Sequence, residues 1–168
     1  DTWEDLMDQF TNLTGKQPLP PLWAFGNFSS RFGYHSQKET RETVNKFIED
    51  SIPLDAVIID IYWFGADIKG HMVNLEFLKD SFPTPIKMID DFNDKGVKTI
   101  LVTVPFILTT SKRCDEVVEK KLVATDKEGN PFTYDFYFGN TGLLDIYKPE
   151  TKEWFWNIYK KYTHMGVG

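Results

Sequence analysis

The stretch AVIIDIYWFG, residues 56 to 65, gives the clearest indication of architecture in this sequence. Its first four residues are apolar without interruption, which is typical of a strand buried on both faces of a parallel sheet. An acid, Asp60, ends the run, and aromatic residues follow at positions 62, 63 and 64. Ligands of parallel α/β folds bind at the carboxyl ends of the strands. A carboxylate followed by three rings therefore predicts a binding site at the end of this strand.

Helical and strand-like segments alternate along the rest of the chain. Helical periodicity or helix-capping signals predict helices at residues 3–15, 85–96, 111–121 and 148–166. A further helix is predicted to begin with a capping box at residues 36–39 and to end before residue 52. Apolar segments that predict strands are residues 22–28, 54–60 and 97–104. This order is typical of βαβ units with a parallel sheet, so the expected fold class is α/β.

Two segments fall outside the alternation. Residues 123–138 predict strands around a turn at Gly129, which makes a hairpin-like excursion after the third strand. The proline-rich residues 16–21 predict a stiff linker. We therefore divide the chain into an N-terminal helix with its linker, residues 1–19, and an α/β domain, residues 20–168.

The composition argues against several classes of function. The net charge is −6 and no basic run is present, which disfavours binding to nucleic acid. No apolar stretch approaches the roughly 18 residues of a membrane span. The single cysteine, Cys114, excludes an internal disulfide framework and does not identify a compartment.

No metal or cofactor is expected. His35, His71 and His164 lie far apart without metal-binding spacing. The sequence has neither a glycine-rich phosphate loop nor a nucleophile elbow. Cys114, between Arg113 and Asp115, is interpreted as an ordinary helix residue.

The acid and the rings each have a structural alternative. Aromatic residues make up 15% of the chain, and they build either a large core or a cleft that stacks against sugars. Asp60 either meets a ligand, caps a helix or pairs with Arg31. Residues 27–35 and 105–111, after the first and third strands, also carry polar and aromatic side chains. A cleft shared by the three strand ends is therefore expected.

An ordered set of short motifs resembles glycoside hydrolase family 31, which includes α-glucosidases, α-xylosidases and α-transglucosylases. The motifs are RFGYH at 31–35, IPLDAVIIDIYWFG at 52–65, FP at 82–83, GVK at 96–98 and PFI at 105–107. The resemblance covers about residues 20–168. Residues 60–77 and 133–145 resemble one bacterial branch that contains hydrolases and 4-α-glucosyl transferases.

The resemblance implies the first three βα units of a (β/α)8 TIM barrel, with the site at its C-terminal face. It also implies a retaining mechanism with two carboxylates, one nucleophile and one acid/base. The family's nucleophile lies at the end of the fourth strand, and the chain stops as that strand begins. Both catalytic carboxylates are therefore expected beyond Gly168, and the 168-residue chain is predicted to be inactive alone.

The substrate contacts that the resemblance implies here are partial. Asp60 matches the first acid of the family's D-I-D pattern, whereas Tyr62 replaces the second acid, which in many members binds a sugar hydroxyl. Phe32 replaces a common Trp, and Val104 stands where branch members often carry an acid. The predicted substrate-binding residues are Asp60, Tyr62, Trp63, Tyr34 and Phe106.

The leading hypothesis is part of a retaining hydrolase of α-glucosides or related α-linked oligosaccharides. The alternatives are part of a 4-α-glucosyl transferase and a sugar-binding module without catalysis. The apolar runs at 22–25 and 99–104 would be unpaired edges of an open barrel segment. Such edges promote pairing between chains, so self-association is also expected.

Overall fold

The computed structural model describes residues 2–67, 69–70 and 74–167. Its first sheet contains, in order, β1 (Phe28–Ser30), β2 (Ala56–Ile59) and β3 (Lys98–Leu101). All neighbouring strands are parallel, and β2 pairs with β3 over all four of its residues. The predicted α/β fold is confirmed, and the apolar run that begins at residue 56 is its middle strand.

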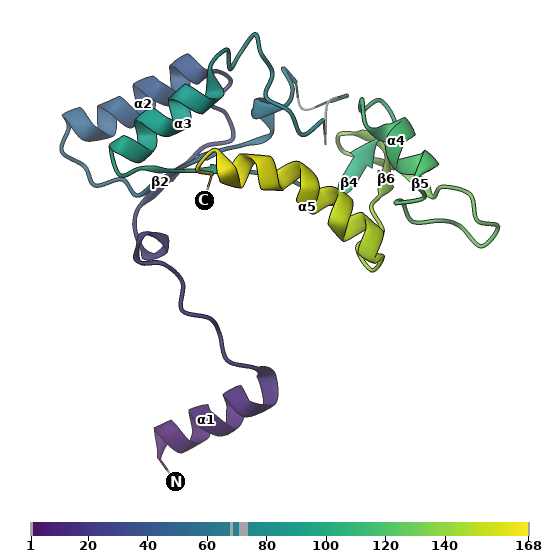
Figure 1. The fold of residues 1–168 in the computed structure, drawn as a ribbon, viewed down its shortest axis with the longest axis horizontal. Coiled ribbons are helices and arrows are strands. Elements are labelled where there is room, and N and C mark those ends of the chain that lie inside the picture. The colour runs from purple at the N-terminus through teal and green to yellow at the C-terminus, as the bar shows by residue number, and fades with distance from the viewer. Residues whose placement is uncertain (1, 68, 71–73, 168) are drawn as a thin grey trace.

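Helices form the connections between these strands. α2 (Gln37–Glu49) connects β1 to β2, and α3 (Pro85–Asp94) connects β2 to β3. The two helices lie side by side (Figure 1). The Ser36 hydroxyl caps α2 by accepting a hydrogen bond from the Glu39 amide at 3.2 Å. The Glu39 carboxylate accepts one from the His35 amide at 2.8 Å, so the reciprocal bond reaches one residue further back than in a regular capping box.

α3 begins and ends where its sequence signals predict. Pro85 is its first residue, where a missing N–H costs no hydrogen bond. Gly96 follows with a φ of +77°, in the left-handed region that glycine adopts without strain. The inner face of α3 is buried at Met88, Ile89 and Phe92, and it joins Val57 and Ile59 of β2 in one core. Each such side chain contributes roughly 1.5–3 kcal/mol by leaving water.

The excursion after β3 forms a second sheet that is antiparallel. Its strands, in spatial order, are β4 (Phe106–Leu108), β6 (Gly139–Leu143) and β5 (Thr133–Phe136), and α4 (Cys114–Glu119) lies between β4 and β5 in the chain. Gly129 does occupy a turn, with a φ of +88° and a bridge between Thr125 and Pro131 beside it. The paired strands β5 and β6, however, join at residues 137–138 instead.

The segment 22–28 differs from its prediction as a strand. Residues Leu22–Phe25 form a short 3-10 helix, η1, and the strand begins only at Phe28. Pro21 provides the cause, because its fixed backbone starts the turn and its carbonyl accepts the Ala24 amide at 3.0 Å. The Asn27 amide then donates to the Asp55 carboxylate at 2.9 Å, which aligns β1 beside β2.

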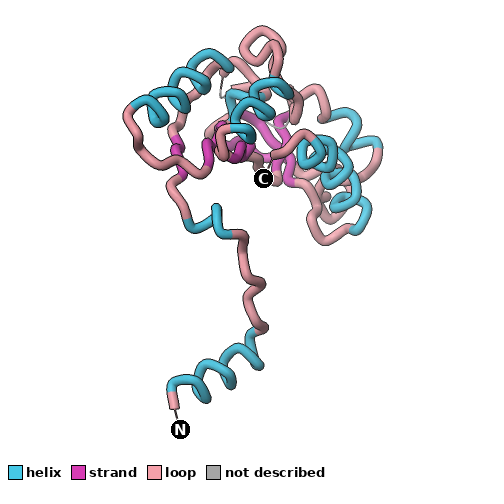
Figure 2. Tube along the Cα trace, turned by 60° about the vertical axis from the view of Figure 1, so that its left-hand side comes forward, coloured by secondary structure: helices cyan, strands magenta, loops and turns pink. Residues whose placement is uncertain are grey.

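The N-terminal helix, α1 (Trp3–Thr14), stands apart from the rest of the chain (Figures 1 and 2). A complete capping box between Thr2 and Asp5 begins it. None of its residues is buried, and its apolar side chains Trp3, Leu6 and Phe10 are exposed. The expected division of the chain near residue 19 stays a prediction.

The last helix, α5 (Pro149–His164), runs from the second sheet back to the first (Figure 1). After it, Val167 forms a parallel bridge with Thr99. Thr99 also pairs with Val57 of β2, so Val167 lies on the opposite side of β3. β3 is therefore bridged on both sides at Thr99 and is not an unpaired edge at this point.

Candidate functional site

Asp60 lies at the carboxyl end of β2, as predicted. Its Oδ1 accepts a hydrogen bond from the Ile61 amide at 2.7 Å and caps the 3-10 turn η2 (Ile61–Trp63). The capping alternative is therefore observed, whereas no ion pair links Asp60 to Arg31 among the described residues. Oδ2 accepts no hydrogen bond from the part of the chain that the structure describes. The Asp60 residue is partly exposed.

Tyr62 joins the ends of the first two strands. Its ring centroid lies 3.7 Å from that of His35 and 5.9 Å from that of Phe32, and both partners follow β1. Tyr62 is partly exposed, and Phe32 is exposed. The residues after β1 and β2 therefore form one aromatic surface next to Asp60. The ends of the first two strands therefore lie next to each other, and the expected cleft shared by all three strand ends stays a prediction.

Tyr34 is held beneath this surface. Only 3% of its surface is exposed, and its hydroxyl lies 2.8 Å from the Ser29 hydroxyl. Its φ of +57° lies in the left-handed region, which is unfavourable for a residue with a bulky side chain. The buried ring and its hydrogen bond fix this backbone and hence the approach of His35 to Tyr62.

Trp63 is fully buried, so its ring presents no face to solvent in this chain. Its indole Nε1 donates to the Val102 carbonyl at 2.9 Å, which ties the end of β2 to the segment after β3. The ring also contacts those of Phe77 and Tyr162, at 5.2 and 5.3 Å between centroids. Trp63 thus holds the strand ends together from within the core.

Phe106 is buried in the second sheet rather than in the aromatic surface around Tyr62. Its ring lies 5.3 Å from that of Phe136 and 5.9 Å from that of Phe138, measured between centroids. The described contacts of the Phe106 ring are therefore with the β5–β6 hairpin.

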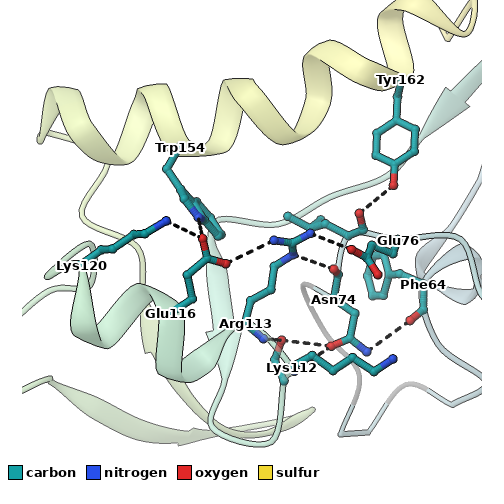
Figure 3. Close-up of polar contacts among 11 residues, drawn as sticks. Phe64, Asn74, Glu76, Lys112, Arg113, Glu116, Lys120, Trp154 and Tyr162 are labelled. Carbon is teal, nitrogen blue, oxygen red and sulfur yellow. Dashed lines mark hydrogen bonds and ion pairs between the residues drawn. The ribbon is translucent and has the colours of Figure 1, made fainter.

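A partly buried polar network connects α4, α5 and the loop after η2 (Figure 3), and sequence reasoning missed it. Arg113 lies at its centre and is 17% exposed. The Arg113 guanidinium donates to Glu76 at 3.2 Å and to Glu116 at 3.3 Å, and Nε donates to the Asn74 carbonyl at 2.8 Å. The Tyr162 hydroxyl donates to the Leu75 carbonyl at 2.7 Å.

Two pKa values reflect this environment. Hydrogen bonding from Lys120 holds the pKa of Glu116 below its ordinary value, and the indole of Trp154, which donates to Glu116 at 2.8 Å, acts in the same direction. Burial raises the pKa of Tyr162 well above its ordinary value. Glu116 is therefore charged and Tyr162 neutral at pH 7, as their hydrogen-bond roles require.

An apolar hollow lies elsewhere, between α5 and the end of β3. It has a volume of about 450 Å³ and includes Leu101, Phe155, Tyr159 and Val167 in its lining. None of the five predicted substrate-binding residues lines it. Burial raises the pKa of Tyr159 to about 12. Because this hollow adjoins the bridge at Val167, it is interpreted as packing space beside β3 rather than as the sugar site.

The described residues contain no group of three or more His, Cys, Asp or Glu side chains arranged to hold a metal ion. None of the helices within the described ranges is long and apolar enough to cross a membrane.

Comparison with known sequences identifies relatives along nearly the whole chain. The family model described as "Glycosyl hydrolases family 31 TIM-barrel domain" matches residues 17–168. The chain is 29% identical to Alpha-glucosidase 2 of Bacillus thermoamyloliquefaciens and 30% identical to Alpha-xylosidase XylQ of Lactiplantibacillus pentosus. Both alignments cover 99% of this chain but only 21% and 22% of those proteins. The chain thus spans about a fifth of their length.

Solved structures agree with this result. The GH31 dextranase of Flavobacterium johnsoniae, complexed with glucose, matches with a TM-score of 0.88 and 26% identity, over 99% of this chain and 20% of that one. A GH31 family sulfoquinovosidase from E. rectale matches with a TM-score of 0.83 and 25% identity, over 99% of this chain and 26% of that one. The parallel strands and their helices are therefore part of a TIM barrel, as predicted.

Proposed function

This chain belongs to glycoside hydrolase family 31 and forms part of its catalytic TIM-barrel domain, and from that premise we propose that it comes from a retaining hydrolase of α-glucosides or related α-linked oligosaccharides. The observation that carries the proposal is the family match over residues 17–168 together with Asp60 at the carboxyl end of β2. In TIM-barrel enzymes the active site lies at this end of the strands.

In this proposal, Asp60 and Tyr62 meet the sugar. The Asp60 Oδ2 atom accepts a sugar hydroxyl, because Oδ1 is already engaged by the Ile61 amide. The ring of Tyr62 supports the apolar face of the sugar, and its contact with His35 fixes the ring's tilt. The buried Tyr34 fixes the backbone before His35, and the buried Trp63 fixes the turn that follows Asp60. Phe106 lies in the second sheet, where its ring packs against Phe138.

The two catalytic carboxylates are proposed to lie outside residues 1–168. One attacks the anomeric carbon to form a covalent glycosyl–enzyme, while the other protonates the leaving oxygen and later activates water. The 168-residue chain is then expected to bind or shape part of the glycone pocket without catalysing turnover. Loss of a catalytic residue typically lowers the rate by several powers of ten.

The test compares two proteins made in parallel. One is encoded by the complete reading frame that contains this sequence, and the other is the 168-residue chain. We expect aryl α-glucoside or aryl α-xyloside hydrolysis by the first only. Turnover by the 168-residue chain above a mock preparation would disprove the assignment of the catalytic groups. Transfer of glucosyl units to sugar acceptors as the main reaction would indicate the transferase, and sugar binding without turnover by either protein would indicate a binding module.

A further inference from the structure

Asn74 is a buried side chain that connects two loops distant in sequence. Its surface is 7% exposed. Nδ2 donates to the Phe64 carbonyl at 3.4 Å, and Oδ1 accepts hydrogen bonds from the Ser111 hydroxyl at 3.1 Å and the Lys112 amide at 3.0 Å. Phe64 follows the turn that begins at Asp60. One amide group therefore joins the turn after β2 to the excursion after β3 (Figure 3).

Arg113 holds Asn74 from its other side. Its Nε donates to the Asn74 carbonyl at 2.8 Å, while the two ends of the guanidinium pair with Glu76 and Glu116. Glu116 is itself fixed by hydrogen bonds from Trp154 and Lys120, both at 2.7–2.8 Å. A planar guanidinium with donors in fixed directions restricts all of these partners at once. The backbone of Asn74 is therefore held as firmly as its side chain.

We propose, on the basis of the function proposed above, that Asn74 and Arg113 are positioning residues that fix the turn carrying Asp60 and Tyr62 against the excursion. Two other hydrogen bonds hold this turn at Trp63: its indole donates to the Val102 carbonyl, and its carbonyl accepts from the Leu78 amide. Among the described residues, the Phe64 carbonyl is bonded only by Asn74. Asn74 therefore controls the end of the turn.

Asn74 acts through Asp60 and Tyr62 rather than on the sugar itself. Its Oδ1 already accepts two hydrogen bonds, and the residue is buried. Productive geometry in an active site tolerates little error, and a displacement of about 1 Å can lower the rate by about a hundredfold. Asn74→Asp removes the donor to Phe64 and keeps both acceptor contacts of Oδ1. It also sets a carboxylate oxygen against the Phe64 carbonyl, and both effects displace the turn.

The physical part of the proposal is tested by amide hydrogen exchange in the protein from the complete reading frame. For Asn74→Asp we expect exchange of the amides at 61–64 to be at least about tenfold faster, with β2 and β3 unchanged. Asn45→Asp is the matched control, because Asn45 is exposed on α2 and accepts a hydrogen bond from Lys95 at 2.7 Å. Unchanged exchange at 61–64, or equal acceleration across the sheet, would overturn the positioning role. Arg113→Lys serves if Asn74→Asp does not fold, and the same result is expected of it.

The functional part is tested by a double-mutant cycle with Asp60→Asn. We expect Asn74→Asp to lower kcat/KM by about tenfold, and the double variant to be no slower than Asp60→Asn alone, because both changes disable the same contact. Losses that multiply would show that Asn74 acts independently of Asp60. If the unmutated protein has no activity on α-glycosides, the proposed function fails, whereas hydrogen exchange still decides whether Asn74 positions the turn.

Discussion

Replacement of Asp60 separates its structural role from its proposed role, because its two oxygens have different partners. Oδ1 accepts the Ile61 amide at 2.7 Å, and in Asp60→Asn the amide oxygen still accepts this bond. In Asp60→Ala the cap is lost, at a cost of about 1 kcal/mol. A sugar hydroxyl that donates to the charged Oδ2 contributes about 1.5–3 kcal/mol, and only the carboxylate provides that interaction.

The expected outcome of Asp60→Asn is therefore a change of less than about 0.5 kcal/mol in the free energy of unfolding. The same variant is expected to lower kcat/KM by about 10- to 150-fold, which is the loss of 1.5–3 kcal/mol expressed as a rate ratio. Urea unfolding and initial rates with an aryl α-glucoside measure the two quantities on the protein from the complete reading frame. The assignment of Oδ2 to sugar binding would be refuted if Asp60→Asn lost as much stability as Asp60→Ala while its kcat/KM stayed within about twofold of that of the unmutated protein.

Four further predictions concern the chain as a folded object. Trp63→Phe removes the indole donor and part of a fully buried ring, so we expect the free energy of unfolding in urea to fall by about 2–3 kcal/mol. The control Trp156→Phe, at an exposed position, is expected to change it by less than about 0.5 kcal/mol. Tyr162→Phe leaves the buried Leu75 carbonyl without its 2.7 Å partner and is expected to cost about 1–3 kcal/mol in the same assay. The pKa of Glu116 is lowered in the folded state, so the charged carboxylate stabilises the fold above its ordinary pKa of 4.5. This stabilisation is lost as the pH falls through the folded pKa, and Glu116→Gln is expected to flatten the dependence of the unfolding free energy on pH in that acidic range. Finally, the 168-residue chain is expected to form a dimer or larger assembly in light scattering coupled to gel filtration, because β1 presents an unpaired edge; a monodisperse monomer of 19.6 kDa would contradict this.

The parts of the fold that could be predicted depend on local signals. The apolar run at 56–59, the cap at Ser36 and the Pro85 and Gly96 boundaries each fix backbone conformation within a few residues. β4 was not predicted, because its three apolar residues are too short to show a period and its partner β6 lies far along the chain. At 22–25 an apolar segment that favours a strand is overridden by Pro21, which begins a 3-10 turn.

The candidate site was predictable only in part. Asp60 could be found because an acid at the end of a buried strand interrupts an apolar pattern. The burial of Trp63 could not, because an aromatic residue after a strand has the same appearance in sequence whether it lines a cleft or fills the core. The link between Asn74 and Arg113 joins residues that are 39 positions apart in the sequence, so only the tertiary structure brings it into view.

The most direct test of the proposed function is the configuration of the first product formed by the protein from the complete reading frame. Proton NMR during hydrolysis of an aryl α-glucoside or aryl α-xyloside resolves the anomeric signal before mutarotation. A retaining enzyme with two successive displacements releases the α anomer first, and this is the result that we predict. Initial release of the β anomer, which requires a single displacement by water, would contradict the proposed mechanism.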